Sequence, residues 1–358
     1  MSASVLVNGR FLTMHATGVQ RYARELLMHL PDQVDDEVLV AVPPQTLFDA
    51  RDHDRIARIP TGRQWHGLPG HAWEQVVLPG LAHRAGRRAA LLSPAQWGPV
   101  TVSRQVAVFQ DIGPRLHPEY FPRGYRMMSE TFTPLLVRRC ARLGVSCRAV
   151  ADDLCRHYGA EPGRVDVIPP GVGAPFDSWP VNDLESREGR YCVMVGAHDI
   201  RKNVSWVLGW WPSVYDELGI ELVITTKGQV PARIPQAVLG SPGVIVRTDP
   251  DDEELARLYS GALCLLWPSL YEGFGLPLLE AMAVGTPFLA TDTGAAAELA
   301  VEPGQVLPLD SRRWIDQLRL WSAQGVASLR QASAAAARSW SWAATAQAAA
   351  AALARISG

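Results

Sequence analysis

The stretch Trp267–Ala290, WPSLYEGFGLPLLEAMAVGTPFLA, decides the fold of this chain. The apolar run Ala262–Trp267 leads into it and is long enough for one buried strand. A glycine-rich loop follows, and Pro277 suits the first turn of a helix because its missing N–H would have no helical partner there. Phe288–Thr291 is predicted to be the next strand. This order predicts a βα unit that presents backbone N–H groups and a positive helix-dipole end to a phosphate.

Two carboxylates flank the predicted helix start. Glu272 lies in the loop, and Glu280 lies eight residues later inside the helix. One acid can therefore reach the far end of a bound ligand while the other faces a different part of it. The alternative is an ordinary crossover with a solvated Glu at each end, which would need neither the paired acids nor the two glycines.

The stretch resembles the signature of the retaining glycosyltransferases of family 4, which have the GT-B fold. Their pattern is E-G-F-G-L-P-x-x-E-A-M-A-x-G-x-P-V, and this chain has Glu272-GFGLPLL-Glu280-AMAVGTPF. The resemblance implies that Glu272 holds hydroxyls of the donor sugar and that Glu280 holds the ribose hydroxyls. The donor-binding residues that it implies in this stretch are Gly273, Phe274, Gly275, Leu276 and Glu280.

Length and composition describe a globular protein with sizeable cores. The 358 residues suit two domains, and 47% are hydrophobic while 20% are charged. A net charge of −2 argues against a nucleic-acid partner. The five Cys form no C-x-x-C pair, so we expect buried thiols in a reducing compartment. Arg10 interrupts the short apolar start, so no signal peptide is expected, and no apolar run is long enough to span a membrane.

The N-terminal segment predicts a second phosphate-facing βα unit. A short strand ends at Asn8, and Val19–Leu30 has apolar residues at helical spacing. The sequence TGVQRYARELL, 17–27, resembles the first loop of the family, often G-G-x-x-R-Y, with the single glycine Gly18 in place of a pair. The resemblance implies that the backbone at Gly18 faces the donor diphosphate.

Residues 36–110 alternate short apolar runs with turn-rich segments, which predicts a parallel α/β arrangement. Two segments here, His71–Gln75 and Ser93–Pro99, resemble segments of bacterial polysaccharide mannosyl- and rhamnosyltransferases of this family. Ordinary loop and core residues are an equally good interpretation of both.

Gln110 departs from the family pattern. The family usually has His-Asp where this chain has Gln110-Asp111, and that His contacts the donor sugar near the reacting carbon. A Gln side chain can donate and accept hydrogen bonds, but it carries no proton or charge for catalysis. Gln110 therefore indicates a different sugar contact, an altered specificity or a weakened activity. His117, seven residues further on, is interpreted as structural.

Basic residues are distributed unevenly. Arginines and aromatic residues are interspersed through 84–148, which could rest on an anionic membrane surface. A plain solvated face is the favoured alternative, because the charges are scattered over several elements. Of the 34 basic residues only Lys202 and Lys227 are lysine, the point-charge phosphate binder.

The second half begins with the strand Tyr191–Val195 and the sequence GAHDIRKN, which resembles the family's V-G-x-x-x-x-R-K-N segment. Arg201 and Lys202 lie at this strand-to-helix turn, where two cations can stabilise a leaving diphosphate. A surface basic pair is the alternative. Lys227 follows the strand 222–226 and is expected at the donor site.

The whole chain is therefore predicted to be α/β, with two Rossmann-like domains facing a cleft. We expect an acceptor-binding domain at 1–178, a nucleotide-sugar-binding domain at 187–335, and a C-terminal helix at 336–358 that crosses back to the first domain.

The predicted activity is transfer of a sugar from a nucleotide-diphosphate donor, with mannose from GDP-mannose favoured, to a hydroxyl of a growing polysaccharide or glycolipid. The predicted catalytic residues are Glu272, Arg201, Lys202 and Gln110. The resemblance implies retention of configuration and no metal or other cofactor. We expect a glycan or lipid-linked glycan as acceptor and a cytoplasmic protein, either free or peripheral at the inner membrane face. A non-catalytic sugar-nucleotide-binding or partner-binding protein, and a sugar phosphorylase or epimerase, are the alternatives on this fold.

Overall fold

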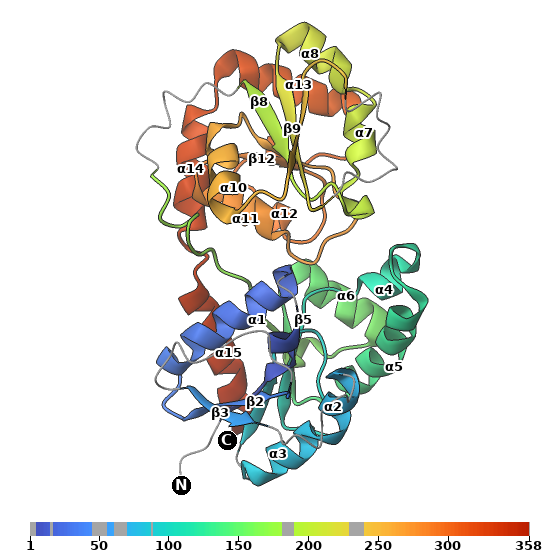
Figure 1. Cartoon of the computed structure of the whole chain (residues 1–358), viewed down its shortest axis with the longest axis vertical. Coiled ribbons are helices and arrows are strands. Elements are labelled where there is room, and N and C mark those ends of the chain that lie inside the picture. Colours follow the sequence, from blue (N-terminus) through green and yellow to red (C-terminus); the bar gives the residue numbers. More distant parts are fainter. Residues whose placement is uncertain are drawn as a thin grey trace. The chain divides into compact units, whose positions relative to one another are not determined.

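The computed structural model shown in Figure 1 describes residues 5–14, 17–44, 56–60, 70–86, 89–180, 190–228 and 240–357. The chain divides into two compact units, the first made of Met1–Gly171 with Ser341–Gly358 and the second of Val172–Trp340. Each unit is built on a parallel sheet with helices, so the predicted α/β class is confirmed. Residues 172–178, which were expected in the first domain, are grouped with the second unit.

The first unit contains a seven-stranded parallel sheet with the order β3-β2-β1-β4-β5-β6-β7. Its central strands are apolar and buried, as a sheet covered on both faces requires. The strands are β1 Val5–Asn8, β2 Val38–Val42, β3 Ile56–Pro60, β4 Ala90–Ser93, β5 Gln105–Phe109, β6 Arg142–Val145 and β7 Val165–Val167.

The C-terminal helix belongs to this first unit and lies beside α1 (Figure 1). Its alanines recur at three- and four-residue spacing and join the core, and Trp342 packs edge-on against Tyr22 with ring centroids 5.9 Å apart. The helices of this unit are η1 Gly9–Thr13, α1 Gly18–His29, η2 Leu30–Asp32, α2 Gly70–Val76, α3 Leu78–Arg84, α4 Gly113–Leu116, η4 Pro118–Tyr120, α5 Arg123–Arg139, α6 Arg148–Tyr158, η5 Pro162–Arg164 and α15 Trp342–Ser357.

The second unit contains a five-stranded parallel sheet with the order β10-β9-β8-β11-β12. The strands are β8 Tyr191–Met194, β9 Glu221–Thr226, β10 Val244–Thr248, β11 Leu265–Trp267 and β12 Phe288–Ala290. The helices are η6 Ile200–Lys202, α7 Val204–Leu208, α8 Trp211–Leu218, α10 Asp252–Gly261, α11 Leu276–Ala283, α12 Ala296–Leu299, η7 Pro303–Gln305, α13 Ser311–Gln324 and α14 Ala327–Ala337.

A buried arginine fastens α14 to the rest of the second unit. Arg330 is only 1% exposed, and its guanidinium donates to the backbone carbonyls of Ser260, Ala262 and Gly285. These carbonyls lie at the end of α10 and just after α11, where a helix leaves acceptors without internal partners. Arg330 therefore satisfies backbone groups that would otherwise be buried and unbonded.

Each sheet reverses its strand order once. In the first unit the chain runs outward from β1 to β3 and then returns to place β4 on the other side of β1. In the second unit it runs from β8 to β10 and then places β11 on the other side of β8. Ligands of open parallel sheets bind outside the carboxyl ends of the strands at such a reversal. Ligand sites are therefore expected at the strand ends Asn8 and Ser93 of the first unit, and at the strand ends Met194 and Trp267 of the second.

Candidate active site

Two loops meet at the reversal point of the second unit. The loop after β8 turns through Gly196, which has a positive φ of 79°, and enters the short helix η6. The loop after β11 ends at Gly275, whose φ of 96° caps the start of α11. The backbone N–H of Leu270 donates to the carbonyl of Arg201 at 2.8 Å, which ties the two loops together.

Lys202 and Glu272 are brought into contact by these loops. Lys202 Nζ donates to Glu272 Oε1 at 2.6 Å, although the two residues are 70 positions apart. Their side chains are only 14% and 10% exposed. The same ammonium group lies 3.7 Å from the centroid of the Trp267 ring, a cation–π arrangement. The structure therefore brings together Lys202 of the RKN segment and Glu272 of the glycine-rich loop, which were predicted site residues in two separate sequence motifs.

Arg201 has a different partner. Its Nε and Nη2 donate to both carboxylate oxygens of Asp199, with a shortest distance of 2.6 Å, and its backbone N–H also donates to Asp199. Burial raises the pKa of the Asp199 carboxyl, but the hydrogen bonds and charge of Arg201, with the charge of Lys202, lower that pKa by more, so it lies below its usual range. The two adjacent cations are thus held by different carboxylates.

The glycine loop before α11 is held by a neighbouring segment. A Cβ atom added at Gly294 would lie 2.9 Å from Glu272 Cβ and 2.9 Å from the carbonyl oxygen of Gly273. The N–H of Ala295 donates to the carbonyl of Phe274 at 3.1 Å. Gly294, which also has a positive φ of 57°, is therefore needed for the position of Glu272. Gly294 also begins the segment Gly294–Leu299, which resembles the family's G-x-x-x-E segment.

The other residues predicted in this stretch lie on α11 or just before it. Glu280 is 7% exposed inside the helix, and Phe274 packs edge-on against Trp340 with ring centroids 5.5 Å apart. Because Pro277 has no N–H and Leu278 N–H donates to the Gly275 carbonyl, the N–H groups expected to meet a phosphate are those of Gly275 and Leu276.

Lys227 lies at the end of β9, where its side chain is exposed. Its backbone N–H donates to His198 Nδ1 at 3.3 Å, which joins the end of β9 to the loop after β8. The position agrees with a strand-end site, but the structure shows no contact between the Lys227 side chain and the Lys202–Glu272 pair among the described residues.

Unpaired polar atoms gather at the same strand ends. Thr226 Oγ1, Trp267 Nε1, Ser269 Oγ and Thr293 Oγ1 are buried and find no hydrogen-bond partner among the described residues. Buried polar groups in folded proteins are nearly always bonded, so a cluster of unbonded ones indicates a place where a polar ligand binds. Thr226 and Trp267 end β9 and β11, and Ser269 and Thr293 follow β11 and β12. All four are therefore at the strand ends where Lys202 and Glu272 lie.

In the first unit, the structure places Gln110 immediately after β5. Its backbone N–H donates to Gln96 Oε1 at 3.1 Å, and its carbonyl accepts from Ser146 Oγ at 2.9 Å. Its side-chain Nε2 is buried and has no partner among the described residues. Gly18 is the first residue of α1 and is exposed, with Thr17 N–H bonded to Gln20 Oε1 at the helix start. Gln110 thus follows a strand and Gly18 begins a helix, both positions that a ligand could contact.

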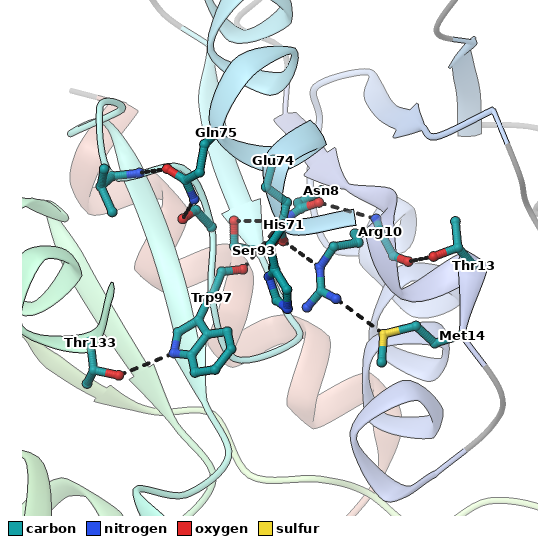
Figure 2. Close-up of polar contacts among 12 residues, drawn as sticks. Asn8, Arg10, Thr13, Met14, His71, Glu74, Gln75, Ser93, Trp97 and Thr133 are labelled. Atoms are coloured by element: carbon teal, nitrogen blue, oxygen red, sulfur yellow. Dashed lines mark hydrogen bonds and ion pairs between the residues drawn. The ribbon is translucent and has the colours of Figure 1, made fainter. Parts of the chain in front are cut away.

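A buried polar cluster at the other reversal point was not predicted. Glu74 is 0% exposed and accepts hydrogen bonds from Asn8 Nδ2 at 2.7 Å and His71 Nδ1 at 2.9 Å, and Arg10 Nε lies 2.8 Å away (Figure 2). Arg10, which interrupts the apolar start of the sequence, is itself only 8% exposed. The segments His71–Gln75 and Ser93–Pro99, both noted for their resemblance, contribute residues to this cluster.

The described residues contain no group of three or more His, Cys, Asp or Glu side chains placed to hold a metal. Two Asp-x-Asp triplets occur in the sequence. The first, at 52–54, lies outside the described residues. In the second, Asp249 Oδ1 accepts from the N–H of Gly228 at 2.9 Å and Asp251 Oδ1 accepts from the N–H of Glu254 at 2.7 Å. Both aspartates thus accept hydrogen bonds from backbone N–H groups, and Asp251 is the N-cap of α10.

Comparison with known proteins agrees with this architecture. The model of Glycosyltransferase Family 4 matches residues 16–174, and the model of Glycosyl transferases group 1 matches residues 189–320. The structure of WaaG, a glycosyltransferase involved in lipopolysaccharide biosynthesis, is similar over 97% of this chain and 98% of its own, with a TM-score of 0.67 and 17% identity. Anabaena Alr3699/HepE in complex with UDP-glucose is similar over 96% and 97%, with a TM-score of 0.66 and 15% identity.

Two curated relatives are similar over part of the chain. One is the MMP alpha-(1->4)-mannosyltransferase of Mycolicibacterium hassiacum, which is 31% identical over 51% of this chain and 44% of its own length. The other is the O-antigen chain mannosyltransferase RfbU of Salmonella typhimurium, which is 24% identical over 59% of this chain and 58% of its own length. The matches thus span about half the length of these relatives.

The paired parallel sheets and the strand-end site define a protein of the GT-B fold. The chain belongs to the family-4 glycosyltransferases.

Proposed function

We propose that this protein transfers a sugar, with retention of configuration and without a metal, from a nucleotide-diphosphate donor to a hydroxyl of a growing polysaccharide or glycolipid. The observation that carries the proposal is the Lys202–Glu272 pair, buried at the reversal point of a sheet beside four unbonded polar atoms. Mannose from GDP-mannose is the favoured donor, because two relatives are named mannosyltransferases. The similarity to a UDP-glucose complex supports a nucleotide sugar in general.

The proposed chemistry uses the charges of the second unit. As the bond between the anomeric carbon and the diphosphate oxygen breaks, the sugar becomes oxocarbenium-like and the diphosphate gains negative charge. Lys202, Arg201 and the N–H groups of Gly275 and Leu276 would stabilise that charge, while Glu272 would hold hydroxyls of the donor sugar. The acceptor oxygen forms the new bond to the anomeric carbon, and the leaving phosphate takes its proton.

The alternative function is non-catalytic binding of a sugar nucleotide or a protein partner. The observations that favour it are Gln110, which cannot carry a proton, and the single loop glycine Gly18. The retained Lys202–Glu272 pair favours the transferase instead.

A donor panel separates the two functions. The full chain would be incubated with GDP-mannose, UDP-glucose, UDP-galactose and dTDP-rhamnose, and release of the nucleoside diphosphate would be measured with and without methyl glycosides as acceptors. We expect release from one donor, fastest with GDP-mannose, and NMR of the product should show the anomeric configuration of the donor. Binding of nucleotides by calorimetry without turnover of any donor would establish the alternative.

Glu280 gives a prediction about the nucleotide. If its carboxylate bonds the ribose hydroxyls, Glu280→Ala should weaken the binding of free GDP by about 1–3 kcal/mol, the cost of losing a charged hydrogen bond. Calorimetry on the folded variant measures this, with the exposed Glu253→Ala as the matched control. Unchanged GDP affinity would show that Glu280 does not bind the nucleotide.

Gln110 gives a prediction about the donor sugar. Its unbonded Nε2 should bond a sugar hydroxyl, so Gln110→Ala should lower kcat/KM by the equivalent of about 0.5–1.5 kcal/mol. Gln110→His should keep or raise the rate, because an imidazole also bonds a hydroxyl. Steady-state kinetics of the wild type, Gln110→Ala and Gln110→His, with the donor that the panel identifies, measure both effects. A Gln110→Ala enzyme with unchanged kinetics would show that the residue does not face the donor.

A peripheral membrane contact and a cytoplasmic location stay predictions. Helix α5 exposes Tyr125 at 36% and Met127 at 67%, next to Arg123 and Arg126. Among the described residues, no helix has both the length and the apolar content that crossing a bilayer requires.

A further inference from the structure

The hydrogen bonds around Glu74 fix the proton of a neighbouring histidine. Glu74 forms a buried ion pair with Arg10, whose Nε lies 2.8 Å from Oε1, and a carboxylate in an ion pair only accepts hydrogen bonds. His71 must therefore donate its Nδ1–H to Glu74 Oε2, across 2.9 Å. In a neutral imidazole this leaves Nε2 without a proton, as a hydrogen-bond acceptor.

The His71 ring is held in place but is not fully covered. Its centroid lies 5.3 Å from that of Trp97, and Figure 2 shows the imidazole between the Trp97 indole and the Arg10 guanidinium. The side chain keeps 29% of its surface exposed, whereas that of Glu74 keeps 1%. The carboxylate thus lies behind the ring, and Nε2 points away from it.

The fold puts this pair where ligands of parallel sheets bind. Asn8, which bonds Glu74, ends β1, and Ser93, within 3.5 Å of Asn8 Nδ2, ends β4. These two strands flank the reversal point of the seven-stranded sheet. The second unit uses the equivalent point for Lys202 and Glu272.

Further aromatic side chains pack on the Trp97 ring that His71 contacts. Tyr125 rests on the same Trp97 ring that His71 contacts, with centroids 5.1 Å apart, and it is 36% exposed. Phe121 is stacked with Tyr125 at 5.8 Å and an interplanar angle of 17°. Tyr125, a partly exposed aromatic side chain on the same indole as His71, suits a pyranose, which has an apolar face and polar hydroxyls at its edge.

We infer that His71 binds the acceptor of the reaction: Nε2, held in position through Nδ1 by Glu74, accepts a hydrogen bond from a hydroxyl of an acceptor pyranose that packs on Tyr125. This inference rests on the proposed function for the meaning of "acceptor". It assigns the recognition of the acceptor hydroxyl to the first unit and leaves the proton transfer to the leaving phosphate. Glu74 is then a positioning residue, because it acts through His71.

The test separates this role from a structural one by using His71→Asn. An Asn amide can still donate to Glu74 in the place of Nδ1, but it has no atom in the place of Nε2. We expect His71→Asn to lower kcat/KM for the acceptor about tenfold, the loss of one hydrogen bond, and to leave hydrolysis of the donor by water unchanged. His83→Asn, at an exposed histidine of α3, is the matched control and should behave as wild type. A His71→Asn enzyme that transfers at the wild-type rate would overturn the inference.

A second readout needs no turnover. Long-range proton–nitrogen correlation spectra of the full chain, labelled at histidine and assigned with His71→Asn, should show an unprotonated Nε2. Four acceptor analogues would be added in turn: methyl α-mannoside, methyl α-rhamnoside, methyl α-glucoside and methyl β-galactoside. At least one of them should shift the Nε2 signal of His71. A protonated Nε2, or no shift with any of the four, would overturn the inference. If the donor panel fails but the shift occurs, only the proposed reaction is wrong.

Discussion

Replacing Lys202 with Gln should lower turnover by about 10²–10³-fold, the effect of removing one preorganised donor from a developing negative charge. The same change should also destabilise the second unit. Lys202 Nζ is 2.6 Å from Glu272 Oε1 in a largely buried pair, and removing one partner of such a pair costs about 3–5 kcal/mol. Steady-state kinetics measure the first effect, and hydrogen exchange of peptides from β8 and β11 measures the second.

A double variant tells the two effects apart. Lys202→Gln with Glu272→Gln removes both charges, so neither is left buried alone, and most of the lost stability should return. Turnover should not return, because the diphosphate still lacks its cation and the sugar its carboxylate. Glu217→Gln, in an exposed ion pair with Arg319, is the control for removing a carboxylate elsewhere in this unit. Recovery of turnover in the double variant would show that the pair is structural.

The strands and helices around Lys202 and Glu272 could be predicted from the sequence because glycine and proline residues mark their ends. Pro268 follows β11, and Gly275 and Pro277 mark the start of α11, as expected. The contact between Lys202 and Glu272 could not be predicted from spacing, because it depends on β8 and β11 being neighbours across a reversal of strand order. The partner of Arg201 was also missed, although Asp199 lies only two residues before it.

The cluster around Glu74 shows a second reason why a site can be missed in the sequence. Its members come from β1, η1 and α2, and each looks ordinary in its own segment. Arg10 seemed only to interrupt an apolar run, but the structure buries it to 8% exposure. Whether an isolated charged residue is solvated or buried depends on a partner far along the chain, here 64 positions away at Glu74, so local pattern cannot decide it.

Because Arg10 is buried against Glu74, we expect replacement of Glu74 to cause a large loss of stability in the first unit. Glu74→Ala should lower the free energy of unfolding by about 3–5 kcal/mol, because it leaves the Arg10 cation buried without a counter-ion. Hydrogen exchange of peptides from β1 and β4 reports the change within this unit. Glu130→Ala, at an exposed glutamate of α5, is the matched control and should change stability by less than about 0.5 kcal/mol.

A double variant tests why Glu74→Ala should lose stability. If the cost comes from an isolated buried charge, Arg10→Met with Glu74→Met should recover most of it, since apolar side chains of similar volume often replace a buried ion pair without loss of stability. If the cost comes from the hydrogen bonds to Asn8 and His71, the double variant should stay as unstable as Glu74→Ala. In either case acceptor use should fall in the double variant while donor hydrolysis persists, because His71 would have lost the carboxylate that fixes its proton on Nδ1.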